Sequence, residues 1–600
     1  MKSLKHFNAY FYKYRYRFLS GILFVTISNI FAVYAPQVVR YAFDLVKETY
    51  DNYRLFDGFE EQESFREFFA KSALFLGLLY IILTLFKGLF MFFMRQTLIV
   101  MSRLIEYDLK NEIFNHYQEL NLAFYKRQNT GDLMNRISED VSRVRMYFGP
   151  AIMYTINLLV LFILVIAAMI SVNPKLTFYV LLPLPFLSVA IYLVSSVINK
   201  KSEAVQSQLS RLSTYVQEAF SGIRVLKAYN REAFSADEFD KECEDYKNKS
   251  MGLVKTNALF FPIMMLLIGL STLLTIYIGG KEAIAGNISV GNIAEFVIYI
   301  NMLTWPVASV GWVTSIIQRA AASQERINEF LNTRPEIKNP SHEPEDIKGT
   351  IEFKRVSFTY PGSGTKALKD FSFKLEPGKV LAIVGKTGAG KSTIANLITR
   401  LYDVSGGEIL VDGKNIRNIN LGDLRSAIGY VPQEVFLFSD NISNNIAFGK
   451  KVDHTDRQLI EQAAKDAAIY SNIVGFPNGF ETLLGERGIT LSGGQKQRIS
   501  IARAIIKKPQ ILIFDDCLSA VDTETEEEIL DNLKKIMKGK SSVIISHRVS
   551  SVRHADHIIV LKDGNIIEEG NHNALMKHRG FYFDLYQKQL LEEEKNIDVQ

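Results

Sequence analysis

Long apolar runs dominate the first half of the chain. A helix that crosses a bilayer needs ~20 apolar residues, because lipid offers the backbone no hydrogen-bond partner and a helix satisfies its own. Helices of soluble proteins are rarely apolar on every face, which argues against a large soluble core. The pattern therefore predicts six membrane-spanning helices, at residues 18–39, 72–94, 151–172, 176–198, 256–280 and 288–317.

The first of these runs also has an alternative interpretation. Basic residues precede it, as they precede the apolar core of a secretory signal peptide. The uncharged run extends from residue 18 to residue 39, however, and is longer than a usual signal core. We therefore expect a retained span.

Basic residues near the ends of the runs predict the orientation. Residues 1–17 include five lysines and arginines and no acidic residue, whereas residues 47–66 carry six acidic residues against three basic ones. Cytoplasmic segments of membrane proteins are enriched in lysine and arginine. We therefore expect the N-terminus in the cytoplasm, and six spans return the chain to that side.

The connections between spans alternate between short and long. Residues 95–150 separate spans 2 and 3, residues 199–255 separate spans 4 and 5, and both segments contain few helix breakers. The simplest interpretation is helices that continue beyond the membrane and double back. The tips of these two cytoplasmic hairpins are predicted near residues 129–132 and 221–224.

Lys87 and Glu295 are the lone ionisable residues inside the predicted runs. A charge in lipid is costly, so such residues tend to face a cavity or a partner. The alternative is that they extend toward an interface, or that the runs are drawn too long. We favour the second interpretation for both residues.

Overall composition and charge exclude several classes of protein. The net charge of +5 is small for 600 residues and argues against a nucleic-acid-coating role. Two cysteines, Cys243 and Cys517, exclude a disulfide framework. We expect a membrane domain at 1–320, a linker at 321–349, a soluble domain at 350–587, and a polar tail at 588–600 that is disordered from residue 592.

The soluble half contains a phosphate-binding loop. A buried strand is predicted at 380–384 and a helix at 394–400, and this strand–loop–helix context is that of a P-loop. Glycines let backbone N–H groups turn toward phosphate oxygens, the lysine reaches the terminal phosphates, and the serine hydroxyl binds Mg²⁺. The loop consists of Gly385, Lys386, Thr387, Gly388, Ala389, Gly390, Lys391, Ser392 and Thr393.

A second apolar strand, at 511–514, ends in two aspartates. A carboxylate at the end of a strand beside a P-loop can hold Mg²⁺, and we assign this role to Asp515. Asp516 occupies the next position, from which a base can activate water. The alternative for two acids after a strand is a solvated turn, and the neighbouring P-loop favours the functional interpretation.

A short Ser-Gly-Gly-Gln segment lies near the end of a long insertion between the two strands. Ser492, Gly493, Gly494 and Gln495 are predicted to open a helix, whose first N–H groups bind anions. By itself the segment is more typical of an ordinary helix cap. Its position between the P-loop and the second strand changes that interpretation.

These motifs together resemble an ATP-binding-cassette (ABC) exporter half-transporter of the multidrug and lipid-exporter type, with a type-1 transmembrane domain (type IV fold). The resemblance covers residues 10–590. It implies an α-helical six-span membrane domain followed by an α/β P-loop NTPase cassette with an inserted helical subdomain. The matching segments are 385–393, Gln433 after Val431-Pro432, 491–495, 511–516, 485–488, Asp522 in 519–522, His547 and Tyr360.

The resemblance implies a role for each matching residue. Two cassettes pair head to tail, so that Ser492, Gly493, Gly494 and Gln495 contact the ATP held by the other chain. Tyr360 stacks on adenine, and Asp522 lines the seam between the cassettes. Gln433 contacts Mg²⁺ or the attacking water, His547 contacts the γ-phosphate, and Ser392, Gln433 and Asp515 are the implied Mg²⁺ ligands.

Asp516 departs from the family pattern, which has glutamate at this position. Aspartate is one methylene shorter, and a misplacement of ~1 Å can cost ~100-fold in rate. Some exporters pair two different chains, one of which carries a weak site. A heterodimer is therefore slightly favoured over a homodimer.

The resemblance implies ATP-driven export, or leaflet flipping, of an amphipathic or lipid-like substrate across a bacterial inner membrane. The alternative is a membrane-anchored ABC ATPase with a regulatory role. Two long hairpins favour the exporter, and membrane and cassette parts on one chain disfavour an importer. The residues do not identify the substrate.

Overall fold

The computed structural model divides into two compact units, which we describe separately. The membrane unit comprises Met1–Gln118 and Gly131–Thr333, and the cassette unit comprises Glu119–Thr130 and Arg334–Gln600. The structure describes residues 7–56, 58–59, 61–341, 343–450, 456–485, 488, 491–517 and 523–597.

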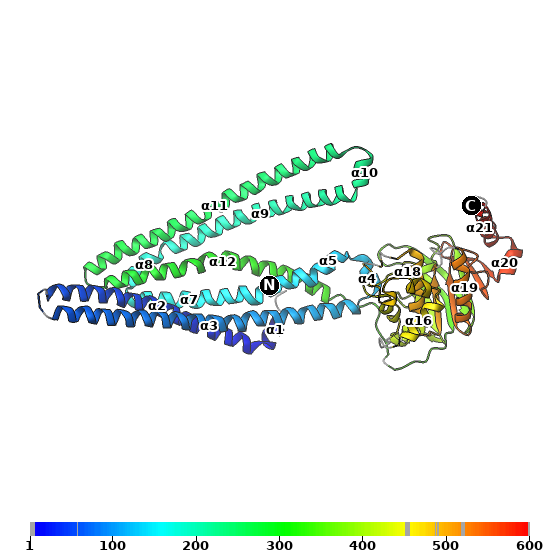
Figure 1. Cartoon of the computed structure of the whole chain (residues 1–600), viewed down its shortest axis with the longest axis horizontal. Coiled ribbons are helices and arrows are strands. Elements are labelled where there is room, and N and C mark those ends of the chain that lie inside the picture. The colour runs from blue at the N-terminus through cyan, green and yellow to red at the C-terminus, as the bar shows by residue number, and fades with distance from the viewer. Residues whose placement is uncertain are drawn as a thin grey trace. The chain divides into compact units, whose positions relative to one another are not determined.

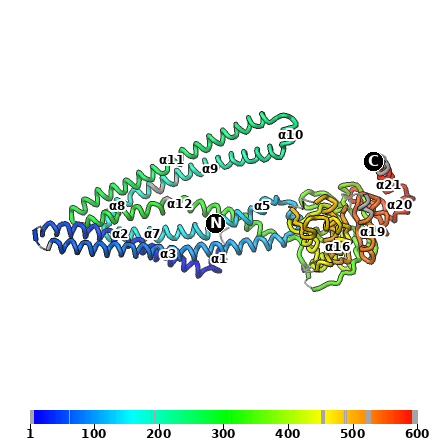
Figure 2. Tube along the Cα trace, in the orientation of Figure 1, coloured from blue at the N-terminus to red at the C-terminus, as the bar shows by residue number. Residues whose placement is uncertain are grey.

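The secondary structure of the membrane unit, in its described residues, is helical (Figures 1 and 2). Within the described residues, six helical segments are long and apolar enough to cross a membrane, which confirms the six predicted spans. The helices are α1 (Phe7–Lys13), α2 (Arg15–Leu55), α3 (Glu61–Glu119), α5 (Thr130–Asn135), α6 (Val141–Met146), α7 (Ile152–Val172), α8 (Pro174–Leu181), α9 (Pro183–Ser221), α10 (Ile223–Ala228), α11 (Glu232–Ile284) and α12 (Val290–Leu331), with π-helical turns at Arg136–Asp140 and Tyr147–Ala151.

The spans extend well beyond the apolar runs, as expected for helical hairpins. Helices α9 and α11 pack along each other and are joined by the short α10, close to the predicted tip at 221–224 (Figure 2). The first tip forms earlier than predicted. Asn121 takes an extended conformation after α3 and the chain turns through α4 (Leu122–Arg127), rather than at 129–132.

The predicted start of the linker at residue 321 is wrong. Helix α12 continues to Leu331, since the segment from 321 to 331 contains neither glycine nor proline. Its last turn is also held by packing. Phe330 is fully buried, its ring meets those of His116 and Tyr117, and its carbonyl oxygen lies 3.1 Å from Nε2 of His116.

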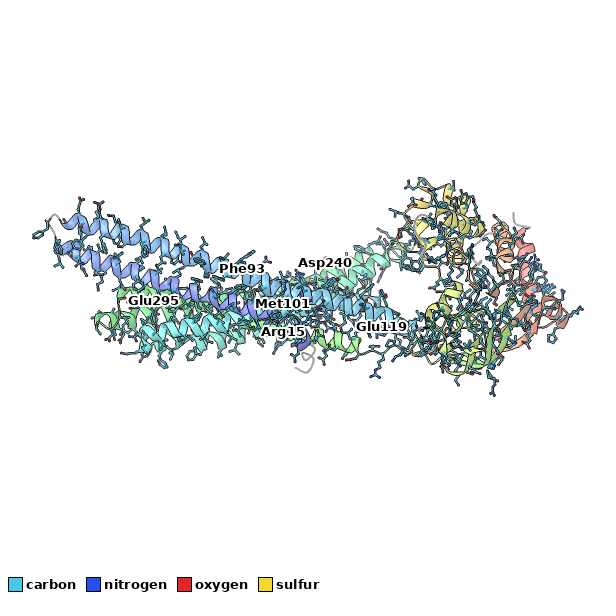
Figure 3. All side chains as sticks on the ribbon, turned by 90° about the horizontal axis from the view of Figure 1, so that it is seen from below. Arg15, Phe93, Met101, Glu119, Asp240 and Glu295 are labelled. Atoms are coloured by element: carbon cyan, nitrogen blue, oxygen red, sulfur yellow. The ribbon has the colours of Figure 1, made fainter. Side chains whose placement is uncertain are left out.

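Glu295 is buried inside the helical bundle, where our favoured interpretation, extension toward an interface, is wrong (Figure 3). The Arg40 guanidinium of α2 lies 3.3 Å from its carboxylate, Asn292 donates a hydrogen bond of 3.1 Å, and the Tyr299 hydroxyl donates one of 3.0 Å. The buried charge is tolerated because it has partners within reach, two of them on adjacent turns of α12 and one on α2. Lys87, by contrast, is exposed on this unit.

The described residues of the cassette unit form two sheets. One has four antiparallel strands in the order β2-β1-β4-β5, and the other has six strands in the order β10-β9-β3-β8-β7-β6, of which all but β10 run parallel. The strands are β1 (Ile351–Thr359), β2 (Lys366–Leu375), β3 (Val380–Gly385), β4 (Gly406–Val411), β5 (Lys414–Asn415), β6 (Ile428–Val431), β7 (Ile511–Asp515), β8 (Ser541–Ile545), β9 (His557–Lys562) and β10 (Asn565–Gly570).

Helices cover the parallel sheet and form the subdomain inserted between β6 and β7. The polar tail predicted as disordered from residue 592 is helical as far as Ile597. The helices are α13 (Lys391–Ile398), α14 (Leu421–Ala427), α15 (Ile442–Ala447), α16 (Arg457–Asp466), α17 (Tyr470–Val474), α18 (Gly493–Ile505), α19 (Thr523–Met537), α20 (His572–His578) and α21 (Phe581–Ile597), with 3₁₀ turns at Ile416–Asn418 and Gly479–Glu481.

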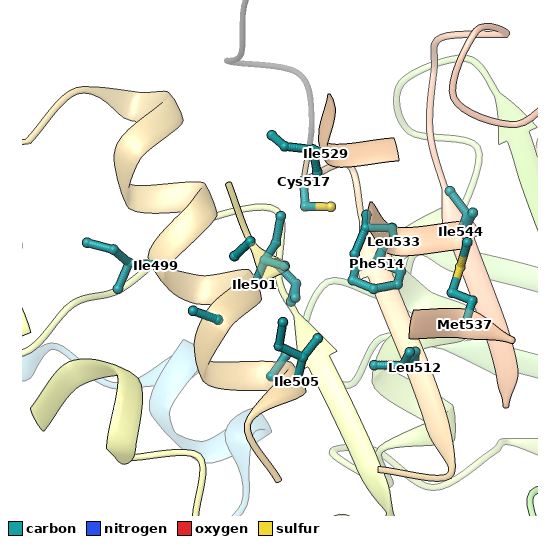
Figure 4. Packing of buried hydrophobic residues seen from close by; sticks show 14 of the residues in the cluster. Ile499, Ile501, Ile505, Leu512, Phe514, Cys517, Ile529, Leu533, Met537 and Ile544 are labelled. Atoms are coloured by element: carbon teal, nitrogen blue, oxygen red, sulfur yellow. The ribbon is translucent and has the colours of Figure 1, made fainter. Parts of the chain in front are cut away.

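The central strands are apolar throughout because both faces of the sheet are buried. Along β7, Leu512 and Phe514 join the cluster that contains α18 and α19, whereas Ile511 and Ile513 join the cluster shared with the antiparallel sheet (Figure 4). Successive side chains of a strand point to opposite faces, and a parallel sheet covered on both sides reads as a continuous apolar run. This is why β3 and β7 were recognisable from sequence.

The tip of the first hairpin belongs to the cassette unit. Ala123 of α4 is 3% exposed and lies in the cluster of the antiparallel sheet. The Asn121 side chain donates a 2.8 Å hydrogen bond to Glu336, and the Arg127 side chain approaches Gly362. Gly362 follows Tyr360 by two residues, so α4 lies against the loop that carries this aromatic side chain.

Replacing Arg40 by alanine is expected to destabilise the membrane unit. The variant leaves the Glu295 carboxylate buried without its countercharge, and breaking a buried pair typically costs ~3–5 kcal/mol. The thermal midpoint of the full chain in detergent measures this effect. Lys47→Ala, an exposed position on the same helix, is the control, and equal midpoints for the two variants would contradict the prediction.

Candidate ATP-binding site

The phosphate-binding loop connects β3 to α13 and depends on glycine. Gly390, the residue before α13, has φ of +101°, and a Cβ there would lie 2.3 Å from the carbonyl oxygen of Ala367. The left-handed conformation and the close approach of a neighbouring strand both exclude larger residues. The loop therefore presents its N–H groups at the start of a helix, where the helix dipole favours an anion.

Lys391 lies within this loop. Its ammonium donates hydrogen bonds to the carbonyl oxygens of Gly385 (2.7 Å) and Lys386 (3.0 Å). Burial lowers the pKa of this ammonium, while the carboxylates of Asp516 and Asp515 oppose that shift. The side chain thus places a positive charge between the loop and the two acids.

Ser392 and Asp515 meet beside the loop. The Ser392 hydroxyl donates a 3.0 Å hydrogen bond to Asp515, which ends β7 and is 2% exposed. Burial raises the pKa of Asp515 to about 6, opposed by the Ser392 hydrogen bond and reinforced by the charge of Asp516. A hydroxyl and a carboxylate oxygen are ligands suited to Mg²⁺.

No group of three or more His, Cys, Asp or Glu side chains in the described part of the chain is arranged to hold a metal ion. Mg²⁺ is usually held by one or two carboxylates and by the phosphates of a substrate, so it does not require such a group. Ser392 and Asp515 therefore fit an ion that arrives with a nucleotide.

Asp516, His547 and Gln433 converge from the ends of three strands. Nδ1 of His547 lies 2.8 Å from one carboxylate oxygen of Asp516, and the Gln433 amide donates a 3.4 Å hydrogen bond to the other. Asp516 has φ of 49°, in the left-handed region. Aspartate adopts this conformation more readily than most residues. Asp516 thus contacts both of the other side chains that sequence analysis assigned to catalysis.

These groups line a pocket of about 390 Å³. The predicted site residues in its lining are Tyr360, Thr387, Gly388, Gly390, Lys391, Ser392, Thr393, Gln433, Asp515, Asp516 and His547. Gly385, Lys386 and Ala389 belong to the same loop but are not part of this lining. The Tyr360 hydroxyl lies 2.9 Å from Oγ1 of Thr393, and its ring packs on Phe358 and Tyr402.

The Ser-Gly-Gly-Gln segment does not take part in this pocket. Ser492 caps α18 by accepting a hydrogen bond from the N–H of Gln495, and the Gln495 side chain accepts one from the N–H of Ser492. Ser492 and Gly493 are exposed, and all four residues, each within the described part, lie outside the pocket lining. The chain therefore carries two separate helix N-termini suited to anions.

Sequence analysis missed one wall of the pocket. This wall consists of Thr365 before β2, Lys366, Ala367 and Lys369 of β2, and Asp563 and Gly564 of the β9–β10 turn. The Gly564 N–H donates a 3.2 Å hydrogen bond to the Ala389 carbonyl, which ties this turn to the loop. No local motif marks these residues. The β9–β10 turn reaches the site through the pairing of β9 with β3, and the β2 residues reach it from the separate antiparallel sheet.

Some predicted residues lie outside the described residues. Asp522, assigned to the seam between cassettes, is one of them, and so are Glu486 and Arg487 of the 485–488 segment.

Replacing Asp515 by asparagine is expected to stabilise the nucleotide-free chain. Since the pKa rises from its usual 3.8 to about 6, burying the charged carboxylate costs ~3 kcal/mol above pH 6. The folded state holds the extra proton, so the stability contributed by protonated Asp515 is lost as the pH rises from about 4 through 6. Thermal midpoints should show a gain for D515N that is largest at pH 7.5 and shrinks toward pH 4. Asp370→Asn, at an exposed site, is the control, and a gain independent of pH would contradict the prediction.

Comparisons with known proteins show the family of the chain. Residues 18–307 match the ABC transporter transmembrane region and residues 368–519 the ABC transporter domain. The chain is 34% identical over 591 residues, 98% of each chain, to the probable multidrug resistance ABC transporter ATP-binding/permease protein YheI of Bacillus subtilis. It is also 34% identical over 505 residues, 84% of each chain, to the ATP-dependent lipid A-core flippase of Pseudomonas fluorescens.

A solved structure gives the same result for the fold. A bacterial Atm1-family ABC exporter with ATP bound superposes with a TM-score of 0.76 at 25% identity, covering 96% of this chain and 98% of that one. The six membrane-spanning helices, the phosphate-binding loop and the two-sheet cassette thus occur together in proteins that bind ATP and export. The chain belongs to the ABC exporter half-transporters, as an integral membrane protein whose cassette binds ATP and couples its hydrolysis to transport.

Proposed function

We propose that the chain is one half of a dimeric exporter that moves, or flips between leaflets, an amphipathic or lipid-like substrate. Its relatives are named as multidrug transporters and as a lipid A-core flippase, and both classes of substrate combine apolar and polar parts. The positive charge before the first span supports a cytoplasmic N-terminus and cassette, in a bacterial inner membrane.

The main observation in support of a dimer is the separation of the two anion sites. The pocket brings together Lys391, Ser392 and both aspartates, whereas the exposed N-terminus of α18 at Ser492 and Gly493 lies outside it. In a head-to-tail dimer, each α18 would face the γ-phosphate bound by the other chain. ATP then stabilises the pair of cassettes, and its hydrolysis removes that interaction. Asp522 is proposed to line the seam.

Within the pocket, each residue has a proposed part in hydrolysis. Water attacks the γ-phosphorus in line with the departing ADP, and Asp516 orients that water and accepts its proton. His547 donates a hydrogen bond to the γ-phosphate, and Gln433 registers whether the phosphate is present. Ser392 and Asp515, with Gln433 nearby, would hold Mg²⁺, which would supply positive charge to neutralise the phosphates. Tyr360 packs against the adenine ring.

Coupling to the membrane domain is proposed to run through the hairpin tips. Helix α4 already belongs to the cassette unit and lies beside the loop of Tyr360. A change in the bound nucleotide would therefore occur close to α4, which continues the membrane hairpin. ATP shifts the equilibrium between inward-facing and outward-facing states by binding one state more tightly than the other.

The alternative is a regulatory membrane ATPase, and a transport assay decides between the two. In proteoliposomes, fluorescent lipid or a cationic dye should be moved only with ATP, and the same probes should stimulate hydrolysis. Lys391→Ala should abolish ATP binding and movement together, because it removes the charge at the terminal phosphates, whereas Lys374→Ala, exposed on β2, should not. Free hydrolysis that no amphipathic probe stimulates, without movement of any probe, would favour the regulator.

The aspartate at position 516 supports the proposal that this chain hydrolyses ATP slowly. A slow site in turn favours a dimer with a different chain as partner. The prediction is tested with the chain purified alone. Asp516→Glu should raise kcat for ATP by about tenfold or more, because the longer side chain recovers ~1 Å of reach. Asp516→Asn should lower kcat further. If the wild type turns over robustly, loses that turnover in D516N and gains nothing in D516E, the site is complete and a homodimer is favoured.

A further inference from the structure

The segment that carries His547 leaves the sheet directly after β8. Its imidazole is 48% exposed and touches Asp516 through Nδ1. An exposed side chain is held mainly by the backbone that bears it, so the position of the imidazole depends on how the 546–549 backbone is fixed. Val549, which follows, is fully buried and anchors the far side of this segment.

A glutamine from the last helix holds this backbone. The Gln589 amide nitrogen donates a 2.7 Å hydrogen bond to the carbonyl oxygen of His547, and the N–H of Val549 donates a 2.8 Å hydrogen bond to the amide oxygen of Gln589. One planar amide thus engages the peptide groups on both sides of Arg548. Two hydrogen bonds from one rigid group fix orientation as well as distance.

Helix α21, which carries Gln589, is itself firmly attached to the cassette. The Glu568 carboxylate of β10 accepts hydrogen bonds from the N–H groups of Phe581 (2.5 Å) and Tyr582 (3.1 Å) at the start of the helix. Tyr582 is fully buried, and its hydroxyl lies 2.8 Å from Nδ1 of His572. Gln589 follows Tyr582 by seven residues and therefore lies on the same face of α21, about two turns on.

We propose that Gln589 is a positioning residue for ATP hydrolysis, which acts through His547 and touches no substrate atom. The inference rests on the proposed function and adds α21 to the catalytic apparatus. The hydrogen bonds to His547 and Val549 set the backbone from which the imidazole reaches Asp516 and the γ-phosphate. A displacement of ~1 Å at a reacting group can cost ~100-fold in rate, so loss of this attachment affects turnover more than nucleotide binding.

The test compares Gln589→Ala and Gln589→Met with Gln587→Ala in the full-length chain in lipid nanodiscs. Gln587 lies on the same helix and is exposed, so it is a matched control. Both Gln589 variants should lower kcat for ATP about tenfold and leave KM within about twofold, with the thermal midpoint close to that of the wild type. Methionine keeps the length of the side chain, which separates loss of the hydrogen bonds from loss of packing. Wild-type kcat in both variants would overturn the proposal.

Two further measurements distinguish positioning from a general structural role. In a His547→Ala background, Gln589→Ala should lower kcat no further, because the residue it positions is gone, and an additive loss would overturn the proposal. Hydrogen exchange at the Val549 amide should be faster in Q589A and unchanged in Q587A, and wild-type exchange in Q589A would also overturn it. This last measurement needs no turnover, so it separates failure of the Gln589 attachment from failure of the proposed exporter function.

Discussion

The parallel pairing of five strands is the constraint on which the whole site depends. In the order β9-β3-β8-β7-β6, each strand ends at the same edge of the sheet and contributes one part of the site. The parts, in that order, are the turn at Asp563, the phosphate-binding loop, His547, Asp515 with Asp516, and Gln433. Ligands of open α/β sheets bind outside the carboxyl ends of the strands. Here the pairing alone brings together residues more than 100 positions apart.

A different constraint governs the membrane unit, where polar groups must find partners among the helices themselves. Glu295 illustrates it, since its carboxylate is satisfied by Arg40 of α2 and by Asn292 and Tyr299 of its own helix. Such a pair contributes little to net stability compared with apolar packing, but it penalises any arrangement that separates α2 from α12. The pair therefore specifies how these two helices meet more than how strongly they meet.

The features of this structure that the sequence predicts are those encoded by neighbouring residues. The spans, the buried strands β3 and β7 and the phosphate-binding loop are marked by contiguous residues, because burial on all sides leaves a local apolar pattern. The partner of Glu295 on α2 and the contact of Gln589 with His547 join positions 255 and 42 apart in the chain, and the β2 wall of the pocket belongs to a different sheet from the loop it faces. No periodicity encodes such contacts, and a lone glutamine near the end of the chain carries no signal.

Asp516 and Gln589 are connected by the same geometry. With a short side chain on a left-handed backbone, the Asp516 carboxylate stays close to the strand end, and His547 meets it at 2.8 Å. In the proposed mechanism the imidazole contacts both this carboxylate and a phosphate, which leaves it little freedom because each contact requires its ring in a defined orientation. The side chain itself is half exposed and supplies little restraint, so the restraint has to come from the backbone. In this chain that backbone is held from α21, so our proposal makes catalysis depend on a helix beyond the segment matched by the ABC transporter domain.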